Sequence, residues 1–399
     1  MKISFFLKMQ EHERKLLIYR ITACAFFVMQ GMIFSTWANR IADIRTALNL
    51  TEADLGLILL GLPFGQLMTM PVSGYLVSRF SSKRCIFFGS IMYPSCLLLI
   101  NAAQGFWSLL GALVCFGISA NINNIAINTQ AVGVENLYGR SIMGTFHGTW
   151  SFACFCGGLF TMLLMHIGVG ITAHFCITII FALTTLMLFG PLLMPKDPIK
   201  TVSESDKSKK RGFFSPTPFI IMLGVTAFGS MSCEGTMFDW SVIYFRDIVK
   251  VPTEFSNVGY IVFMLMMASG RFASDFFVNR FGAIRVLQFS GITITCGMML
   301  AVLLPFALFA TLGFFMVGIG VSSVIPICYS SAAKSHRMPT GIAIATVSSI
   351  GFLGFLLGPP LIGFIAHASN LRISFATMAF AGLIVSIIAP FLRFRLGSK

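Results

Sequence analysis

The sequence predicts an all-α membrane protein with twelve transmembrane helices in two pseudo-symmetric bundles of six. Three observations predict this fold. Only 11% of the residues are charged and 56% are hydrophobic, with a mean hydropathy of +0.86, which leaves too few polar groups to cover a water-facing surface. The apolar residues are gathered into runs long enough to cross a bilayer. Segments half a chain apart also resemble each other.

Twelve apolar runs, each of roughly 20 residues or more, mark the expected spans. In chain order they cover 17–38, 53–76, 84–103, 106–130, 141–165, 171–194, 217–245, 254–278, 284–304, 306–330, 340–366 and 371–393. The polar, basic stretch PKDPIKTVSESDKSKKRGFFS separates the sixth run from the seventh. We therefore expect an N-terminal six-helix bundle over 1–194, a solvated cytoplasmic linker over 195–216 and a C-terminal six-helix bundle over 217–399.

The distribution of positive charge predicts the orientation of the chain. When the loops are assigned alternately to two sides, the side that holds the N-terminus receives 22 of the 28 Lys and Arg residues, and the other side receives five. Cytoplasmic loops carry such an excess of positive charge. We therefore expect a multi-pass protein of the bacterial inner membrane with both termini in the cytoplasm. The net charge of +14 then reflects topology, and we expect no nucleic-acid partner.

The two halves carry matching segments. GYLVSRFSSKR (74–84) follows the second run and DFFVNRFGAIR (275–285) follows the eighth, and their arginines align at an offset of 201. Trp37 and Trp240, near the ends of the first and seventh runs, are 203 residues apart. A parallel repeat of six spans places a substrate site between the halves, near the middle of the membrane.

The turn after the second run carries a recognisable pattern. Its residues are Gly74, Ser78, Arg79, Ser81 and Arg84. The pattern is similar to the Gly-x-x-x-Asp-Arg-x-Gly-x-x-Arg signature of the major facilitator superfamily, with Ser in place of the Asp and of the second Gly. GRFASDFFVNRF (270–281) resembles the exit of the eighth span in the fucose-permease branch of bacterial inner-membrane permeases, as do TWANR (36–40), EGTMFDW (234–240) and GPPLIGF (358–364). The resemblance covers the whole chain and implies a transporter, but it does not specify a substrate.

In such a fold, loop arginines bond helix carbonyls or acidic side chains while the cavity is open to the outside, and release them when it opens inward. The expected members of this cytoplasmic latch are Arg79, Arg84, Glu135, Asp275, Arg280 and Arg285. The alternative is that the arginines only anchor the helices at the headgroups and fix the topology. Both roles are compatible.

The most informative residue of the second half is Glu234, in MSCEGTMFDW. It lies roughly 25 Å along the seventh span, where an acid is rare and by default functional. A carboxyl group partly removed from water can exchange a proton near neutral pH, so we expect Glu234 to face the cavity and to couple transport to protons. The alternative is a water-exposed acid paired with Arg246 or Arg40. For Asp239, closer to the outer edge, we expect a gate pair with Arg40 or Arg246.

The fourth span carries a stripe of amides at Asn121, Asn124 and Asn128, spaced i, i+3 and i+7. Facing a wet cavity, the stripe would bind a hydroxyl-rich solute; the alternative is hydrogen bonding between helices. The fucose-permease pattern resembles Glu-x-x-x-Asn here, whereas this chain has Asn124 and Asn128. The resemblance therefore implies either that Glu234 carries the proton or that the carrier is a uniporter.

Four further residues in the spans are candidates. His147 is a possible proton relay, because the unperturbed pKa of imidazole is about 6.5. The alternative is that His147 bonds a neighbouring helix. Trp150 stacks on a sugar ring or fills an interface, and Gln30 is a candidate polar wall residue. Arg271 precedes Asp275 by four residues, which favours a local ion pair. The alternative is that the loop arginines hold Asp275, which leaves Arg271 free to meet an anion or Glu234.

The motifs of enzymes are missing from the sequence, which contains no GxxxxGK[ST], HExxH or GxSxG. The ten scattered cysteines predict neither disulfides nor a metal site, and we expect no cofactor. We expect a monomeric secondary transporter that uses protons to move a small polar, sugar-like solute, rather than a channel, receptor or scaffold. Export of amphipathic drugs or metabolites by proton antiport is the alternative, since the abundant Phe and Met also line promiscuous cavities.

Overall fold

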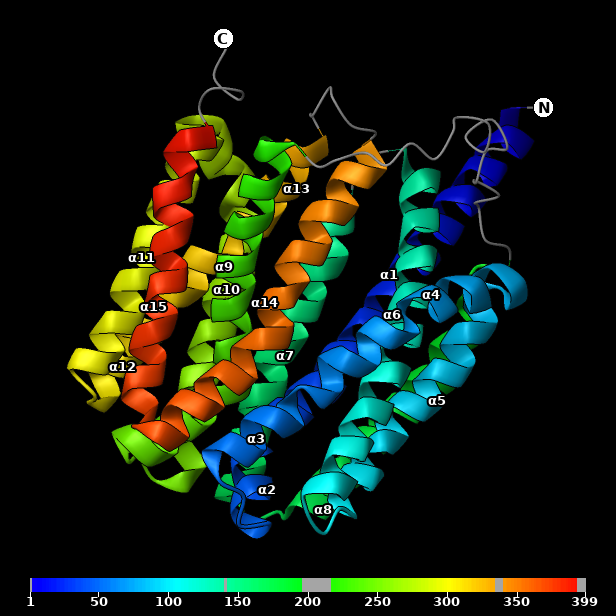
Figure 1. Cartoon of the computed structure of the whole chain (residues 1–399). Coiled ribbons are helices and arrows are strands. Elements are labelled where there is room, and N and C mark those ends of the chain that lie inside the picture. The colour runs from blue at the N-terminus through cyan, green and yellow to red at the C-terminus, as the bar shows by residue number, and fades with distance from the viewer. Residues whose placement is uncertain (1, 140–141, 196–216, 334–339, 393–399) are drawn as a thin grey trace.

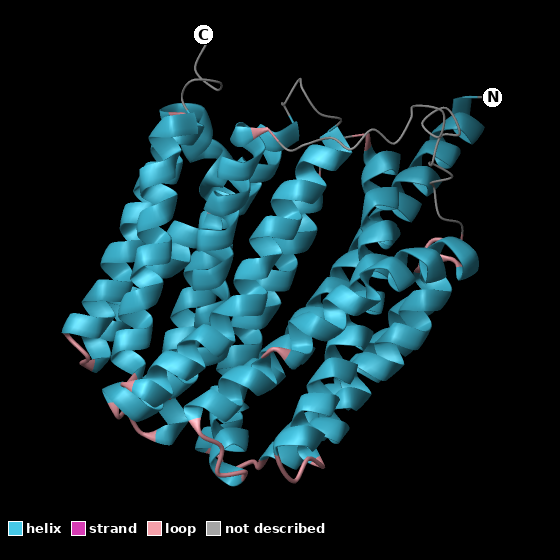
Figure 2. Cartoon of the chain, viewed as in Figure 1, coloured by secondary structure: helices cyan, strands magenta, loops and turns pink. Residues whose placement is uncertain are grey.

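A computed structural model describes residues 2–139, 142–195, 217–333 and 340–392. These residues form helices joined by short loops, and no strand occurs among them (Figure 2). The first half comprises α1 (Lys2–Ala38), α2 (Ile41–Ala47), α3 (Glu52–Leu59), α4 (Gly61–Phe80), α5 (Ser82–Asn101), α6 (Phe106–Tyr138), α7 (Met143–His166) and α8 (Ile171–Phe189). The second half comprises α9 (Pro218–Tyr244), α10 (Val258–Phe281), α11 (Ala283–Leu303), α12 (Ala307–Ser322), α13 (Val324–Ala333), α14 (Thr340–Ala368) and α15 (Leu371–Ile388).

Two of the expected spans are each divided into two helices. α3 ends at Leu59 and α12 ends at Ser322, in both cases four residues before a proline, Pro63 and Pro326 respectively. The ring of a proline clashes with the carbonyl group four residues earlier and cannot donate to it, which ends a helix there. The pairs α3–α4 and α12–α13 therefore stand for one span each, and the short α2 lies in a loop.

Eleven segments of the described chain are long and apolar enough to cross a membrane. The helix that lacks the required hydropathy is α10, which carries Arg271 near its middle and Arg280 in its last turn. At 24 residues it is nevertheless as long as the helices around it. With α10 as the twelfth span, the chain has the predicted twelve-helix architecture. Residues 196–216 of the expected linker lie outside the described residues.

The two halves meet along two pairs of helices, α7 with α10 and α3 with α14 (Figure 1). Glycines allow the second pair to approach closely. A Cβ atom at Gly56 would lie 3.0 Å from the Cα atom of Gly363, and a Cβ atom at Gly363 would overlap the carbonyl oxygen of Glu52. The halves are therefore in backbone contact near the end of the bundle where α2 lies. The first turn of α1 and the end of α15 lie at the opposite end (Figure 1).

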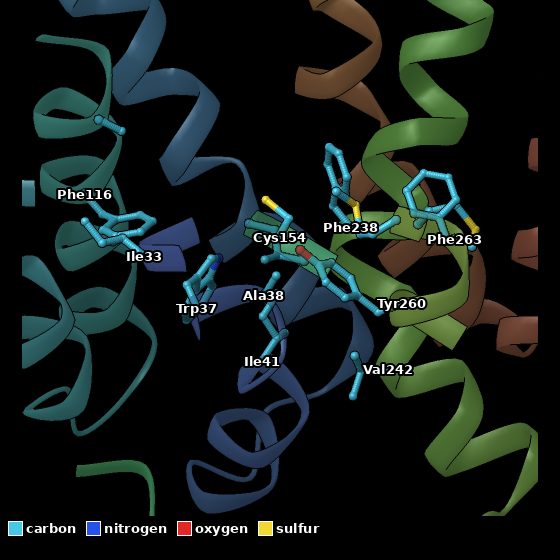
Figure 3. Close-up of a cluster of buried hydrophobic side chains, with 14 of the residues drawn as sticks. Ile33, Trp37, Ala38, Ile41, Phe116, Cys154, Phe238, Val242, Tyr260 and Phe263 are labelled. Atoms are coloured by element: carbon cyan, nitrogen blue, oxygen red, sulfur yellow. The ribbon is translucent and has the colours of Figure 1, made fainter. Parts of the chain in front are cut away.

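Buried apolar side chains from both halves form one continuous cluster. Figure 3 shows Trp37 and Ile33 of α1 and Cys154 of α7 on one side, with Phe238 of α9 and Tyr260 of α10 on the other. Both Trp37 and Tyr260 are almost fully buried. Several members of the cluster, among them Trp37 and Phe238, also line the cavity described next.

Candidate functional site

A cavity of about 440 Å³ lies between the two halves. Its walls come from α1, α3, α4, α5, α6 and α7 of the first half and from α9, α10, α13 and α14 of the second. The lining includes the polar or charged side chains of Gln30, Gln66, Asn124, His147, Asp239 and Arg271, and Trp37, Tyr93 and Tyr329 add an indole N–H and two hydroxyl groups. Pockets for small ligands have this size and this combination of apolar walls with few polar groups.

Aromatic rings from both halves meet across the cavity. The ring centroid of Phe34 on α1 lies 5.7 Å from that of Trp150 on α7 and 5.3 Å from that of Phe238 on α9. Phe238 in turn stacks on Phe355 of α14, with centroids 6.1 Å apart and planes 4° from parallel. Flat apolar faces of this kind bind sugar rings as well as hydrophobic ligands. The predicted residue Trp150 is therefore part of the cavity wall.

The face that α9 presents to the cavity differs from the prediction. Met231, Gly235, Phe238 and Asp239 line the cavity, which is the i, i+4, i+7, i+8 spacing of one helix face. Glu234 lies at the edge of that face, about 40° around the helix from Phe238. It is 5% exposed and is not part of the lining. Asp239, rather than the expected Glu234, is therefore the carboxyl group of α9 in the cavity wall.

Glu234 faces Arg271. The Nη2 atom of Arg271 donates to Oε1 of Glu234 at 3.0 Å, and its Nη1 atom donates to Oγ of Ser151 at 2.8 Å. Glu234 lies on α9 and Ser151 on α7, so the guanidinium group joins the two halves. The side chain of Asp275 lies outside the described residues, so the local pair of Arg271 with Asp275 stays a prediction, whereas the pair with Glu234 is the alternative that the sequence offered. Arg271 also lines the cavity, so Glu234 acts on the cavity through it.

Asp239 is the acid that faces the cavity directly. It is half-buried and has no hydrogen bond or ion pair within the described chain. The predicted gate pair with Arg40 or Arg246 does not form in this structure. Both arginines instead donate to Asp43 of α2, and Arg246 follows Asp239 by seven residues, about two helical turns. An unpaired carboxyl group at this depth is costly unless it binds a proton or a cation.

α1 contributes two polar groups without partners. Oε1 of Gln30 and Nε1 of Trp37 are buried and make no hydrogen bond within the described chain, and both residues line the cavity. One is an acceptor and the other a donor. Buried groups of this kind are normally satisfied, so each calls for a ligand or a water molecule. The sequence indicated Gln30 but not Trp37, which is 1% exposed and would have been taken for a core residue.

The amide stripe of α6 is divided between two roles. Asn124 lines the cavity, and its Oδ1 atom accepts a hydrogen bond from Nδ2 of Asn128 at 2.8 Å. This leaves the Nδ2 group of Asn124 free to donate. Asn121 is buried and accepts a hydrogen bond from Ser73 of α4 at 2.7 Å, which is the interhelical alternative. Asn124 therefore faces the cavity, Asn128 orients it, and Asn121 joins two helices.

His147 reaches the cavity from α7. Its ring lies 5.5 Å from that of Phe27 in an edge-on arrangement, and both side chains belong to the lining. It lies one helical turn from Trp150 and Ser151 on the same helix. The cavity thus contains an acid, an imidazole and a guanidinium group, each from a different helix.

A cluster of charges closes the bundle at the α2 end. Arg246 bonds Asp43, and Arg45 bonds Asp247, each across the interface between the halves. Arg45 also bonds Glu52 at 2.6 Å. Arg246 and Asp247 lie in a short π-helix, Phe245–Val249, that continues α9. The sequence interpretation named Arg40 and Arg246 for this end, with Asp239 as their expected partner, but missed the roles of Asp43, Arg45, Asp247 and Glu52.

The opposite end of the bundle carries the arginines of the expected latch. Arg79, Arg84, Arg280 and Arg285 are exposed and form no ion pair with any described residue. Glu135 accepts a hydrogen bond from the backbone N–H of Ile142 at 2.7 Å, within the same half. The structure is thus closed by ion pairs at the α2 end, whereas the four latch arginines at the other end form none with a described residue.

Two helical bundles that enclose a cavity and meet at a charged closure define a membrane carrier. The sequence model of the Major Facilitator Superfamily matches residues 21–347. The chain belongs to this superfamily of transporters. In the described residues there is no cluster of His, Cys, Asp or Glu that could hold a metal ion.

Relatives and solved structures agree with this assignment. The chain is 30% identical to an uncharacterized MFS-type transporter of Yersinia pestis over 92% of this chain and 94% of the relative. It is 29% identical to the membrane protein MosC of Rhizobium meliloti over 93% and 89%, respectively. Its fold is similar to that of the nucleoside transporter NupG, with a TM-score of 0.77 and 11% identity, over 94% of this chain and 99% of NupG. It is also similar to that of a D-xylose-proton symporter, with a TM-score of 0.74 and 13% identity, over 95% of this chain and 97% of the symporter. It is also similar to FucP in the outward conformation (0.60, 15%, 95% and 99%).

Proposed function

We propose that this chain is a secondary transporter of the bacterial inner membrane that couples protons to the movement of a small, hydroxyl-rich, sugar-like solute. The observation that carries the proposal is the cavity between the halves, in which unsatisfied hydrogen-bonding groups stand among aromatic rings beside a free carboxyl group. Solved structures of similar fold include a D-xylose-proton symporter and a nucleoside transporter, whose substrates carry several hydroxyl groups.

The polar groups of the cavity match hydroxyl groups. Gln30 offers an acceptor, Trp37 a donor and the Nδ2 group of Asn124 further donors. A hydroxyl group donates and accepts at once, so a solute with several of them satisfies all three residues. The faces of Trp150 and Phe34 then pack against the apolar side of the ring.

Proton coupling rests on Asp239. Its carboxyl group faces the cavity without a partner, so binding a proton there removes an uncompensated charge. Glu234 is held by Arg271 and acts differently, because a proton on Glu234 would weaken the ion pair that orients the guanidinium group toward Ser151. His147 lies on the same cavity and is suited to pass protons to and from it.

The gates give the direction of opening in this structure. If the basic ends of the chain are cytoplasmic, the Asp43–Arg246 and Arg45–Asp247 closure lies at the outer face. The structure then represents an inward-facing state, in which the cytoplasmic latch is released. Alternating access would break the outer ion pairs and form the latch at the opposite end.

Proteoliposomes test the proposal. The purified protein is first screened for thermal stabilisation by D-xylose, L-fucose and related sugars, and a stabilising sugar is then offered to proteoliposomes that contain a pH-sensitive dye. We expect the sugar to move protons with it, and an imposed pH gradient to accumulate it. Asp239→Asn should still exchange labelled for unlabelled sugar but should not accumulate it. Uptake that ignores the pH gradient, or accumulation by Asp239→Asn, would overturn the coupling.

A second function, export of amphipathic cations by proton antiport, is favoured by one observation. The free carboxyl group of Asp239 stands next to the ring of Phe238, and aromatic rings together with an acid attract organic cations. One carboxylate binds either a proton or a cation, which produces exchange. Tetraphenylphosphonium and ethidium, tested in the same stability screen, decide between the two functions: stabilisation by these cations and by none of the sugars would support export.

A further inference from the structure

A second cavity, of about 600 Å³, lies at the turn between α4 and α5, away from the central cavity. Its lining consists of Arg79, Phe80, Ser81, Lys83, Arg84, Phe87, Phe88 and Pro195. Three of these side chains are cationic, and none of the described lining residues is acidic. The turn is tight, because Ser81 (φ 77°) is the only residue between the end of α4 and the start of α5. This geometry brings the three cations together.

The two arginines have no partner of their own. Neither Arg79 nor Arg84 makes a hydrogen bond or an ion pair with the part of the chain that the structure describes, whereas the Nζ atom of Lys83 donates to the carbonyl oxygens of Pro191 and Leu193 at 3.0 and 3.4 Å. Lys83 is therefore held in place while both guanidinium groups are free. The free N–H groups in the first turn of α5, a helix of 20 residues, add positive potential at the same point.

Apolar side chains lie directly beside these charges. Phe88 is 69% exposed, and Phe87 and Phe80 are exposed as well. Phe87 and Phe88 follow Arg84 by three and four residues, so they lie one turn further along the same face of α5, toward the middle of the membrane. A ligand that fits this site has an anionic group for the arginines and an apolar chain for the phenylalanines.

We propose that this cavity binds the phosphate group of an anionic glycerophospholipid, with an acyl chain along Phe87 and Phe88. Because α5 spans the membrane, its first turn lies at the level of the headgroups, where basic pockets between helices bind such lipids. A free phosphate ion shares the chemistry of the headgroup but would leave the phenylalanines exposed.

The second half of the chain provides an internal control. The turn between α10 and α11 has the same backbone conformation at Gly282 (φ 82°) and keeps an arginine, Arg285, at the position of Arg84. Ile284 stands in the position of Lys83, and Gln288 in that of Phe87. The position of Phe88 is occupied by Phe289, which is also exposed. Arg285 is therefore exposed like Arg84 and carries the same topological charge, but it lacks the lysine and one of the two phenylalanines of the site.

Native mass spectrometry of the purified full chain in detergent tests the proposal. The protein is titrated with phosphatidylglycerol, with phosphatidylcholine and with inorganic phosphate. We expect phosphatidylglycerol to be retained more strongly than phosphatidylcholine, and we expect Arg84→Gln to weaken its retention about fivefold, which is the effect of one basic residue near an anionic lipid surface. Arg285→Gln should leave retention unchanged, and Arg84→Lys should restore most of it.

Three results would overturn the site. Equal loss of phosphatidylglycerol in Arg84→Gln and Arg285→Gln would mean that the charges act only through topology. Equal retention of the zwitterionic lipid would remove the role of the arginines. Stabilisation by inorganic phosphate as strong as by phosphatidylglycerol, in a thermal unfolding assay of the same samples, would identify a site for a free anion. Phe88→Ser, which keeps every charge, should weaken lipid retention without affecting phosphate.

Discussion

Replacing Asp43 by Asn should open the α2 end of the transporter, which is the outer end in the proposed orientation. Asp43 accepts a hydrogen bond from Arg40 at 2.9 Å within the first half, and a second from Arg246 across the interface. Asn preserves the shape of the side chain but removes its charge. The bond to Arg40 lies within one rigid half and is available in both states, so the change acts on the equilibrium between states through Arg246 alone.

The size of the effect follows from the exposure of the pair. Hydrogen bonds to charged groups contribute about 1.5–3 kcal/mol. Since the side chains of Asp43 and Arg246 are each 17% exposed, solvent screening reduces this value, and we expect about 1–2 kcal/mol. The ratio of outward-facing to inward-facing molecules should therefore rise about 5- to 30-fold.

The distance between the halves reports this shift. Spin labels at Ala47 and Thr253, which are exposed on opposite halves at the α2 end, give a distance distribution in reconstituted protein by electron double resonance. We expect a longer distance to gain population in Asp43→Asn. The matched control is Asp54→Asn at the same end, because Asp54 caps α3 and its hydrogen bonds go to Thr51 of its own half. An unchanged distribution in Asp43→Asn, or the same change in the control, would refute the role of the ion pair.

Three further changes have defined outcomes. Gly363→Ala places a methyl group against the backbone of α3 only while the α2 end is closed. In the same distance measurement it should therefore favour the state that is open at this end by about 1–3 kcal/mol. Gly111→Ala, which has open space around it, should not change the distances. Arg271→Gln leaves the buried Glu234 without its partner and should lower the free energy of unfolding by about 3 kcal/mol in detergent, and adding Glu234→Gln should restore part of this loss. Gln30→Leu removes an unsatisfied acceptor and should raise the KM for the transported sugar about fivefold, with kcat unchanged; an unchanged KM would exclude Gln30 from the site.

The sequence predicted the helices well, because hydropathy and the distribution of basic residues act over whole segments. It did not predict which side of a helix meets which neighbour. Glu234 and Asp239 are five residues apart on α9, and only the packing of α9 against α10 and α14 decides that Asp239 reaches the cavity. Similarly, Asn121 and Asn124 share a stripe in the sequence, but Ser73 of α4 takes up the first of them.

The gate residues of α2 were missed for a different reason. Asp43 and Arg45 lie in α2, a helix of only 7 residues in a segment that was taken for a loop, and a polar loop residue carries no signal of its own in one sequence. Their partners Arg246 and Asp247 lie 200 residues away, roughly half the chain. Nothing local in the sequence pairs these residues.

The repeat, however, does contain this information. In a pseudo-symmetric carrier, the axis that relates the halves passes through the closed gate, and residues beside the axis meet their own counterparts, as in any two-fold interface. Asp43 and Arg246 are separated by 203 residues, which is the spacing of Trp37 and Trp240, and Arg45 and Asp247 are separated by 202. Identical charges at such positions would repel each other, so a duplicated carrier that closes with ion pairs needs opposite charges at the repeat spacing. Opposite charges at one repeat length, just after the first span of each half, therefore predict an outer gate from sequence alone.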